Sequence, residues 1–244
     1  MTRFMKFTLV ELLLVGVILM MLASFLLPAV MKSKAQARRT NCLSNLNQLG
    51  IAARLYSDEQ KHYPSTVRQG AGTEKYYWCA YLNGTDFDFS RGIMSDYVKN
   101  YNIYRCPEFE LAGNLISMSS SLPSTCSYGI NAEYVGGSPA PSEPEILNTP
   151  PVKLQEIKKP AATLIFMDSA AASGSSLSES YYFWARYYFL GGPDHEARSH
   201  FRHLRFANGI FCDGHAEDNI LPDAIDNPPD LKIGWPAQDK CQRE

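Results

Sequence analysis

A long apolar run near the N-terminus constrains this chain more than any other feature. Between Phe7 and Met31 the only charged side chain is that of Glu11. As a helix, such a run is long enough to cross the hydrocarbon core of a bilayer, which takes about 20 residues. A carboxylate well inside it costs about 2.5–3.5 kcal/mol on insertion scales. The sequence therefore predicts one membrane segment, in which Glu11 either lies near the membrane surface or has a partner.

Helical periodicity continues beyond the apolar run. Apolar residues recur there three or four positions apart and so share one face of a helix: Cys42, Leu46, Leu49, Ala53 and Tyr56. Pro28 removes one backbone hydrogen bond and is expected to kink the helix without ending it. We predict a single helix from about Phe7 to about Glu59, which stops before Pro64 because the residue preceding a proline disfavours helix. Residues 7–31 form its membrane half and residues 32–60 its amphipathic half.

The rest of the chain, residues 61–244, reads as a folded domain in water. Hydrophobic residues make up 45% of the chain, charged residues make up 20%, and a net charge of −2 gives no general attraction to nucleic acid. Ala162–Ser169 and Asn208–Ile220 predict strands, with a tight type I′ hairpin turn at Asp213-Gly214. The aromatic stretch Tyr181–Leu190 is interpreted as a core strand or an interface.

Two proline-rich segments, Ser138–Pro151 and Pro222–Gln238, predict loops without regular structure. The expected fold class is thus α+β: a long N-terminal helix packed on an antiparallel sheet head with long loops.

Six cysteines are spread along the chain without a Cys-x-x-Cys pair, which argues against a zinc ribbon or a thioredoxin-like site. Outside the cytoplasm they allow up to three disulfides in about fifteen connectivities, or several buried thiols. Cys42 lies on the helix face expected to meet the head, and Cys106 lies in a Cys-Pro turn typical of a docked loop. We predict that these two pair and tether head to helix, which would contribute roughly 2–4 kcal/mol.

Basic residues flank the apolar run on both sides. Arg3 and Lys6 precede it, and the following segment carries Lys32, Lys34, Arg38 and Arg39. By the positive-inside rule this count favours a head in the cytoplasm.

The N-terminal pattern resembles a known family. A short basic leader followed by Phe-Thr-Leu-Val-Glu and an apolar helix is similar to type IV pilins and type II secretion pseudopilins. The resemblance implies that residues 1–6 are a leader, that a prepilin peptidase cuts between Lys6 and Phe7, and that the new amino group of Phe7 is methylated. Lys6 stands where the family usually has glycine, and Pro28 stands where many pilins have a helix-breaking proline. The resemblance also implies a bacterial inner-membrane protein with its head outside the cytoplasm, which conflicts with the charge count.

A second resemblance lies in the head. His203, followed after nine residues by Asp213-Gly214, is similar to the His-x9-Asp-Gly signature of a large pilin-like family. The internal motifs "CLSNLNQLG" (Cys42–Gly50), "YRCPE" (Tyr104–Glu108) and "SYGIN" (Ser127–Asn131) resemble that family too.

Four histidines gather near Cys212 and Asp213: His195, His200, His203 and His215. Imidazole, thiolate and carboxylate suit zinc, but no spacing here matches a zinc motif. We therefore predict that His203 hydrogen-bonds to the hairpin and holds Asp213-Gly214, with no metal, cofactor or catalytic site. The acidic tail lacks EF-hand spacing, although the resemblance leaves loop-bound calcium open: Asp218, Asp223, Asp226 and Asp230.

The expected function is that of a filament subunit and not of an enzyme. Its expected partners are other copies or related pilins, the prepilin peptidase, an inner-membrane assembly platform and the bilayer, with no nucleic acid. In the filament, Glu11 of an incoming subunit would meet the Phe7 amine of the subunit before it and set the register. The alternatives are a membrane-anchored extracytoplasmic binding protein or enzyme that uses residues 195–215, and a secreted protein cut after Ala35-Gln36-Ala37.

Overall fold

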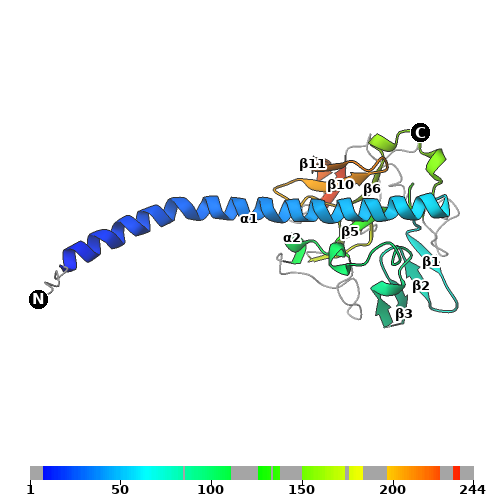
Figure 1. Cartoon of the computed structure of the whole chain (residues 1–244), viewed down its shortest axis with the longest axis horizontal. Helices are drawn as coiled ribbons and strands as arrows, with labels where there is room; N and C mark the ends of the chain where they lie inside the picture. Colours follow the sequence, from blue (N-terminus) through cyan, green and yellow to red (C-terminus); the bar gives the residue numbers. More distant parts are fainter. Residues whose placement is uncertain are drawn as a thin grey trace, which may run out of the picture. The chain divides into compact units, whose positions relative to one another are not determined.

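The structure is a computed structural model that describes residues 8–84, 86–110, 126–132, 134–137, 150–173, 176–183, 197–225 and 233–236. The chain divides into two compact units, Met1–Ala37 and Arg38–Glu244. The division falls inside helix α1, Leu9–Gln60, so the helix contributes to both units. Figure 1 shows the elements in sequence colours.

Helix α1 confirms the predicted long helix and its predicted end. Pro28 lies inside it without ending it, and the proposed kink stays a prediction. The predicted face is buried at every position: Cys42, Leu46, Leu49, Ala53 and Tyr56. Helical periodicity alone therefore identified the face of α1 that is buried within the second unit.

The main sheet of the second unit is antiparallel in all but one of its described pairings. Its principal strand order is β11-β10-β6-β9-β13-β12, while β5 and β7 also pair with β6. The exception is β5, which pairs in parallel with β8. The strands of this sheet are β5 Tyr128–Asn131, β6 Leu164–Ser173, β7 Ser176–Ser178, β8 Tyr182–Phe183, β9 Ala197–His200, β10 Ala207–Phe211, β11 Ala216–Ile220, β12 Pro222–Ile225 and β13 Ile233–Pro236. The α+β fold class is confirmed.

Strand β10 is covered on both faces, because every one of its residues is buried and successive side chains point to opposite faces. On one face Ile210 packs with Leu46 and Leu49 of the helix. A Cβ added at Gly50 would stand 2.7 Å from Cγ1 of Ile210, so helix and strand approach closely there. On the other face Phe211 packs with Leu164 and Phe201 in a separate cluster.

A smaller antiparallel sheet, in the order β1-β2-β3-β4, follows α1 in the chain. Its strands have three residues each: β1 Val67–Gln69, β2 Lys75–Tyr77, β3 Tyr81–Asn83 and β4 Asp86–Asp88. The described residues also include four 3₁₀-helices: η1 Phe89–Arg91, η2 Tyr101–Tyr104, η4 Leu154–Glu156 and η5 Pro160–Ala162. A one-turn helix, α2 Pro107–Glu110, follows Cys106.

The predicted strands at 162–169 and 208–220 are present as β6 and the β10–β11 hairpin. The expectation of an irregular tail was wrong, since β12 and β13 pair with each other and β13 pairs with β9. Pro222 is tolerated there because it begins β12, the strand at the edge of the sheet, where a missing N–H disrupts no inner ladder. Most of the aromatic stretch after Phe183 and most of Ser138–Pro151 lie outside the described residues.

Candidate functional site

The start of α1 gives Glu11 a local partner. The backbone N–H of Thr8 and its hydroxyl both donate to Oε2 of Glu11 at 2.8 Å. In return the Glu11 N–H donates to the Thr8 hydroxyl at 3.3 Å. This reciprocal arrangement is a capping box, which satisfies two orphan donors of a helix N-terminus. Lys6 and Phe7, the predicted cleavage and methylation positions, lie outside the described residues.

The first part of α1 exposes apolar side chains on all sides. Between Leu9 and Met31 the large hydrophobic residues are all about half exposed or more, among them Leu9 at 79% and Phe25 at 74%. The helix is long and apolar enough to cross a membrane, and its most apolar 18-residue window has none of its residues buried. Both a membrane anchor and a signal sequence show these properties.

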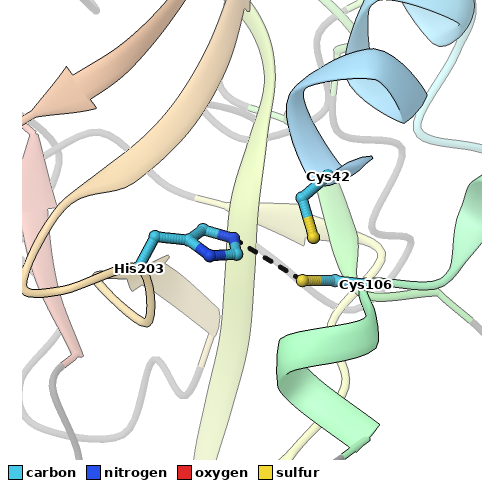
Figure 2. A group of neighbouring side chains, drawn as sticks. All are labelled: Cys42, Cys106 and His203. Carbon is cyan, nitrogen blue, oxygen red and sulfur yellow. Dashed lines mark hydrogen bonds between the residues drawn. The ribbon is translucent and has the colours of Figure 1, made fainter. Parts of the chain in front are cut away.

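The second unit holds a buried group of metal-type ligands. The sulfurs of Cys42 and Cys106 and a ring nitrogen of His203 all lie within 4.8 Å of one another. Figure 2 shows the three side chains pointing toward one another from α1, from the segment before α2 and from the segment between β9 and β10. Nε2 of His203 stands 3.6 Å from Sγ of Cys106. The exposed fractions of the three residues are 0%, 0% and 2%.

This group, which we call the Cys–Cys–His cluster (Cys42, Cys106, His203), adjoins a buried ion pair. Oδ2 of Asp168 stands 3.4 Å from Nε2 of His203, and Oδ1 of the same carboxylate stands 3.3 Å from Nε of Arg202. Asp168 also accepts the N–H of Asn208 at 2.7 Å. Arg202 donates from one nitrogen to the carbonyls of Ser127 at 2.6 Å and Ser169 at 3.1 Å. Buried charges of this kind require such partners.

The pKa values of the cluster follow from these contacts. Burial by itself would raise the pKa of Cys106, but the hydrogen bond from Cys42, the charge of Arg202 and the hydrogen bond from His203 lower it to about 5. The same hydrogen bond and burial raise the pKa of Cys42. Burial would lower the pKa of His203, and the Asp168 carboxylate outweighs it and raises the pKa to about 9. The two shifts have opposite directions, so Cys106 is the more acidic of the two cysteines.

The structure brings Cys42 and Cys106 together, as the predicted disulfide requires, and carries both as thiols. Their bonding stays a prediction. The sequence did not single out Cys79 and Cys126, which are also buried. Their side chains hydrogen-bond to each other. Cys241 lies outside the described residues.

The predicted contact of His203 with the hairpin was wrong. Its side chain faces Asp168 and Cys106, and its backbone forms a two-way bridge with Phe206. His203 and Gly214 stand at opposite ends of β10, a strand of roughly 17 Å at about 3.3 Å per residue. The nine residues of the motif therefore span β10 and hold His203 and Asp213-Gly214 apart.

The hairpin itself is confirmed, but its turn type was wrong. Gly214 donates to the carbonyl of Phe211 and Phe211 donates to that of His215, both at 2.9 Å. Gly214 has a φ of +95°, while Asp213 is absent from the described residues with positive φ. A type I′ turn needs positive φ at both central residues, so this is a three-residue loop that ends in a left-handed glycine. Asp213 accepts from the His215 ring at 2.6 Å instead of from His203.

The remaining candidates are scattered. His200 is buried beside the ring of Phe109, and Cys212 is buried in the hairpin turn, where its carbonyl accepts from the Tyr63 hydroxyl at 3.0 Å. Asp218 pairs with Arg39 at 3.4 Å. His195, Asp226 and Asp230 lie outside the described residues, as does the side chain of Asp223. The calcium option and the proposed use of residues 195–215 therefore stay untested.

The cluster has the donors of a soft metal site and the thiolate of a nucleophile. Thiolate and imidazole are typical zinc ligands. A nucleophilic role needs access for a substrate, and the burial of all three residues denies it. The described geometry is thus better suited to holding an ion or closing a disulfide than to catalysis.

Comparison with known proteins gives one match. A family model described as a protein of unknown function (DUF1559) matches residues 31–83, which include Cys42 but neither Cys106 nor His203. No curated protein matches. No solved structure matches either.

Proposed function

We propose that this chain is a pilin-like subunit of a bacterial type IV pilus-like or type II secretion-like filament. Its N-terminal helix anchors it in the inner membrane before assembly and packs in the filament core afterwards. The observation that carries the proposal is the first part of α1, from Leu9 to Met31. Its apolar side chains are exposed on every side, and Glu11 is its only charged residue. A helix that is apolar all round must be covered by lipid or by other helices. The family match assigns no function, so the proposal rests on this helix and on the resemblance of its N-terminus.

The head is proposed to lie outside the cytoplasm. The positive-inside count opposes this, but two of its four basic residues after the apolar run are engaged in the second unit. Arg38 forms an ion pair with Glu108, and Arg39 pairs with Asp218 and lies over the ring of Phe206. Arg38 and Arg39 thus also serve the folded head, while the positive-inside count itself still opposes this orientation.

The N-terminus of the protein taken from cells tests the proposal. A chain that starts at Phe7 with one added methyl group supports processing by a prepilin peptidase. A start at Arg38 would show a secreted protein with an ordinary signal peptide, and an intact Met1 would show a simple anchor. Either of the last two results overturns the filament proposal.

Glu11 is proposed to set the register of assembly through its charge. Cleavage leaves the Phe7 amine four residues before Glu11 in the chain, and in an apolar core each charge needs the other, within a chain or between neighbours. Glu11→Ala should still insert and be cut before Phe7 but should assemble poorly or not at all, and Glu11→Asp should be intermediate. Filament counts beside an immunoblot for processed protein measure both steps.

The capping box supplies the matched control. Glutamine also serves at the third helical position of such a box, so Glu11→Gln keeps the acceptor for the Thr8 N–H and removes only the charge. If charge sets the register, Glu11→Gln fails like Glu11→Ala. Normal filaments from Glu11→Gln, with none from Glu11→Ala, would show that capping is the function of Glu11 and would refute the register role.

A further inference from the structure

The Cys–Cys–His cluster brings three metal-ligand atoms together. Two sulfurs and one imidazole nitrogen within 4.8 Å of one another are three of the four donors of a tetrahedral zinc site. Zinc–sulfur bonds of about 2.3 Å and zinc–nitrogen bonds of about 2.0–2.1 Å hold ligand atoms at separations of this size. A disulfide would use only the two sulfurs, whereas a metal ion uses His203 as well. We propose that Cys42, Cys106 and His203 bind one thiophilic divalent cation, of which zinc is the representative, and that this ion bridges α1 to the head.

Charge balance favours a divalent ion. Two thiolates neutralise a 2+ ion when His203 is the neutral imidazole that coordination requires. The neighbouring carboxylate of Asp168 and the guanidinium of Arg202 neutralise each other at 3.3 Å. The filled site would then carry no net charge in a place where Asp168 and both cysteines are 0% exposed. A monovalent ion in the same site would leave one uncompensated negative charge, which is costly in such an interior.

A hollow lies beside the chain neighbours of both cysteines. A hollow of about 520 Å³ is lined by Asn41, beside Cys42, and by Arg105 and Pro107, on either side of Cys106. Asn45 also lines it and donates to the Arg105 carbonyl at 3.0 Å and to the Tyr128 hydroxyl at 3.4 Å. Residues that adjoin both cysteines in the chain therefore line a polar hollow, and an ion in it would reach the sulfurs only if the side chains between them move.

The ion would fix three distant segments at one point. Cys42 comes from α1, Cys106 from the segment before α2 and His203 from the segment after β9. Each belongs to a different sequence motif, and none lies near another in the chain. A ligand set distributed in this way binds only the folded head, so metal binding stabilises that fold by mass action.

The test uses the full-length chain, purified in detergent under anaerobic, reducing conditions. We expect the protein as isolated to contain one zinc or other divalent metal per chain. After chelation it should take up one Co²⁺ with a thiolate-to-cobalt charge-transfer band, and Zn²⁺ should displace it. X-ray absorption of the zinc form should give two sulfur neighbours at about 2.3 Å.

Substitutions identify the ligands. Cys42→Ser, Cys106→Ser and His203→Ala should each weaken binding by more than the roughly 10–100-fold that loss of an outer-shell partner costs. Cys212→Ser is the matched control, since Cys212 is also a buried thiol but lies outside the cluster, and it should leave affinity unchanged.

Several results would overturn the proposal. One is a reduced, folded wild-type protein that binds neither Co²⁺ nor Zn²⁺ stoichiometrically. Another is an X-ray absorption spectrum of the zinc form without sulfur neighbours. A third is undiminished metal binding by Cys42→Ser and Cys106→Ser. Metal-free protein from cells with a Cys42–Cys106 disulfide would also overturn it and would establish the disulfide as the bridge. If the variants do not fold, the wild-type spectra and disulfide mapping decide alone.

Discussion

Replacing Arg202 with methionine should destabilise the head strongly. Arg202 is 5% exposed, and its removal strips the fully buried carboxylate of Asp168 of its guanidinium partner. Loss of one partner from a buried ion pair costs about 3–5 kcal/mol, mainly because the other charge stays buried. Asp168 keeps His203 and the Asn208 N–H, so we expect the lower end, about 3 kcal/mol. Methionine retains much of the packing over the Phe109 ring, which now lies 4.6 Å from the guanidinium.

The measurement is urea unfolding of the full-length protein in detergent, with chelator present, followed by near-ultraviolet circular dichroism. In a thermal scan of the same sample, a loss of about 3 kcal/mol corresponds to a fall in Tm of roughly 6–12 °C for a unit of this size. Arg54→Met is the matched control. Arg54 pairs with Asp58 one turn away at 3.2 Å, and both side chains are more than half exposed. Such a pair contributes about 0.3–0.5 kcal/mol.

A double variant separates charge from shape. Asp168→Asn removes the charge that Arg202→Met leaves unpaired, so the two changes together should cost clearly less than the sum of their separate costs. Additive effects would show that the two residues do not interact energetically. A cost for Arg202→Met within error of that for Arg54→Met would refute the reasoning from the buried ion pair.

Two glycines give further predictions. Gly214→Val should lower stability by about 1–2 kcal/mol because an L-residue resists the φ of +95°, although nothing stands within 4 Å of the added Cβ. Gly214→Asn should cost less, because asparagine tolerates positive φ better. Equal urea midpoints for the two variants would contradict this reasoning. Gly50→Ala gains about 1 kcal/mol of helix propensity but forces its Cβ to 2.7 Å from the buried Ile210, which costs about 1–3 kcal/mol. We therefore expect net destabilisation that Ile210→Val relieves, and a more stable Gly50→Ala protein would show that the approach of α1 to β10 is looser.

Regular periodicity made α1 and the β10–β11 hairpin predictable. The buried face of α1 follows from apolar residues three and four positions apart, and the hairpin follows from a strand pattern around Asp213-Gly214. The small sheet could not be predicted, since strands of three residues are too short to show an alternation. The capping box was predictable from sequence, because Thr8 and Glu11 have its spacing, although the partner of Glu11 was expected in the membrane.

The candidate cluster was hidden for a different reason. In the sequence Asp168 simply ends an apolar run and Arg202 stands in a basic, histidine-rich segment, so neither shows that it is buried. Burial of each becomes favourable only through the other, across a separation that no local pattern spans. The same holds for the metal-type ligands, whose spacings along the chain match no motif because three different elements supply them.

The geometry of β10 gives the His-x9-Asp-Gly pattern a physical meaning. The residues between its ends make a tight turn, in which Leu204 and Arg205 both have positive φ, and then the buried strand β10. One end places His203 against Cys106, and Cys42 of α1 belongs to the same cluster. The other end places the hairpin turn where the carbonyl of Cys212 accepts from Tyr63, just beyond the end of α1. A residue inserted into β10 would reverse the faces of every side chain beyond it and take one of these two contacts out of register. The nine-residue spacing is therefore the length of strand needed to attach β10 to the helical segment at both ends.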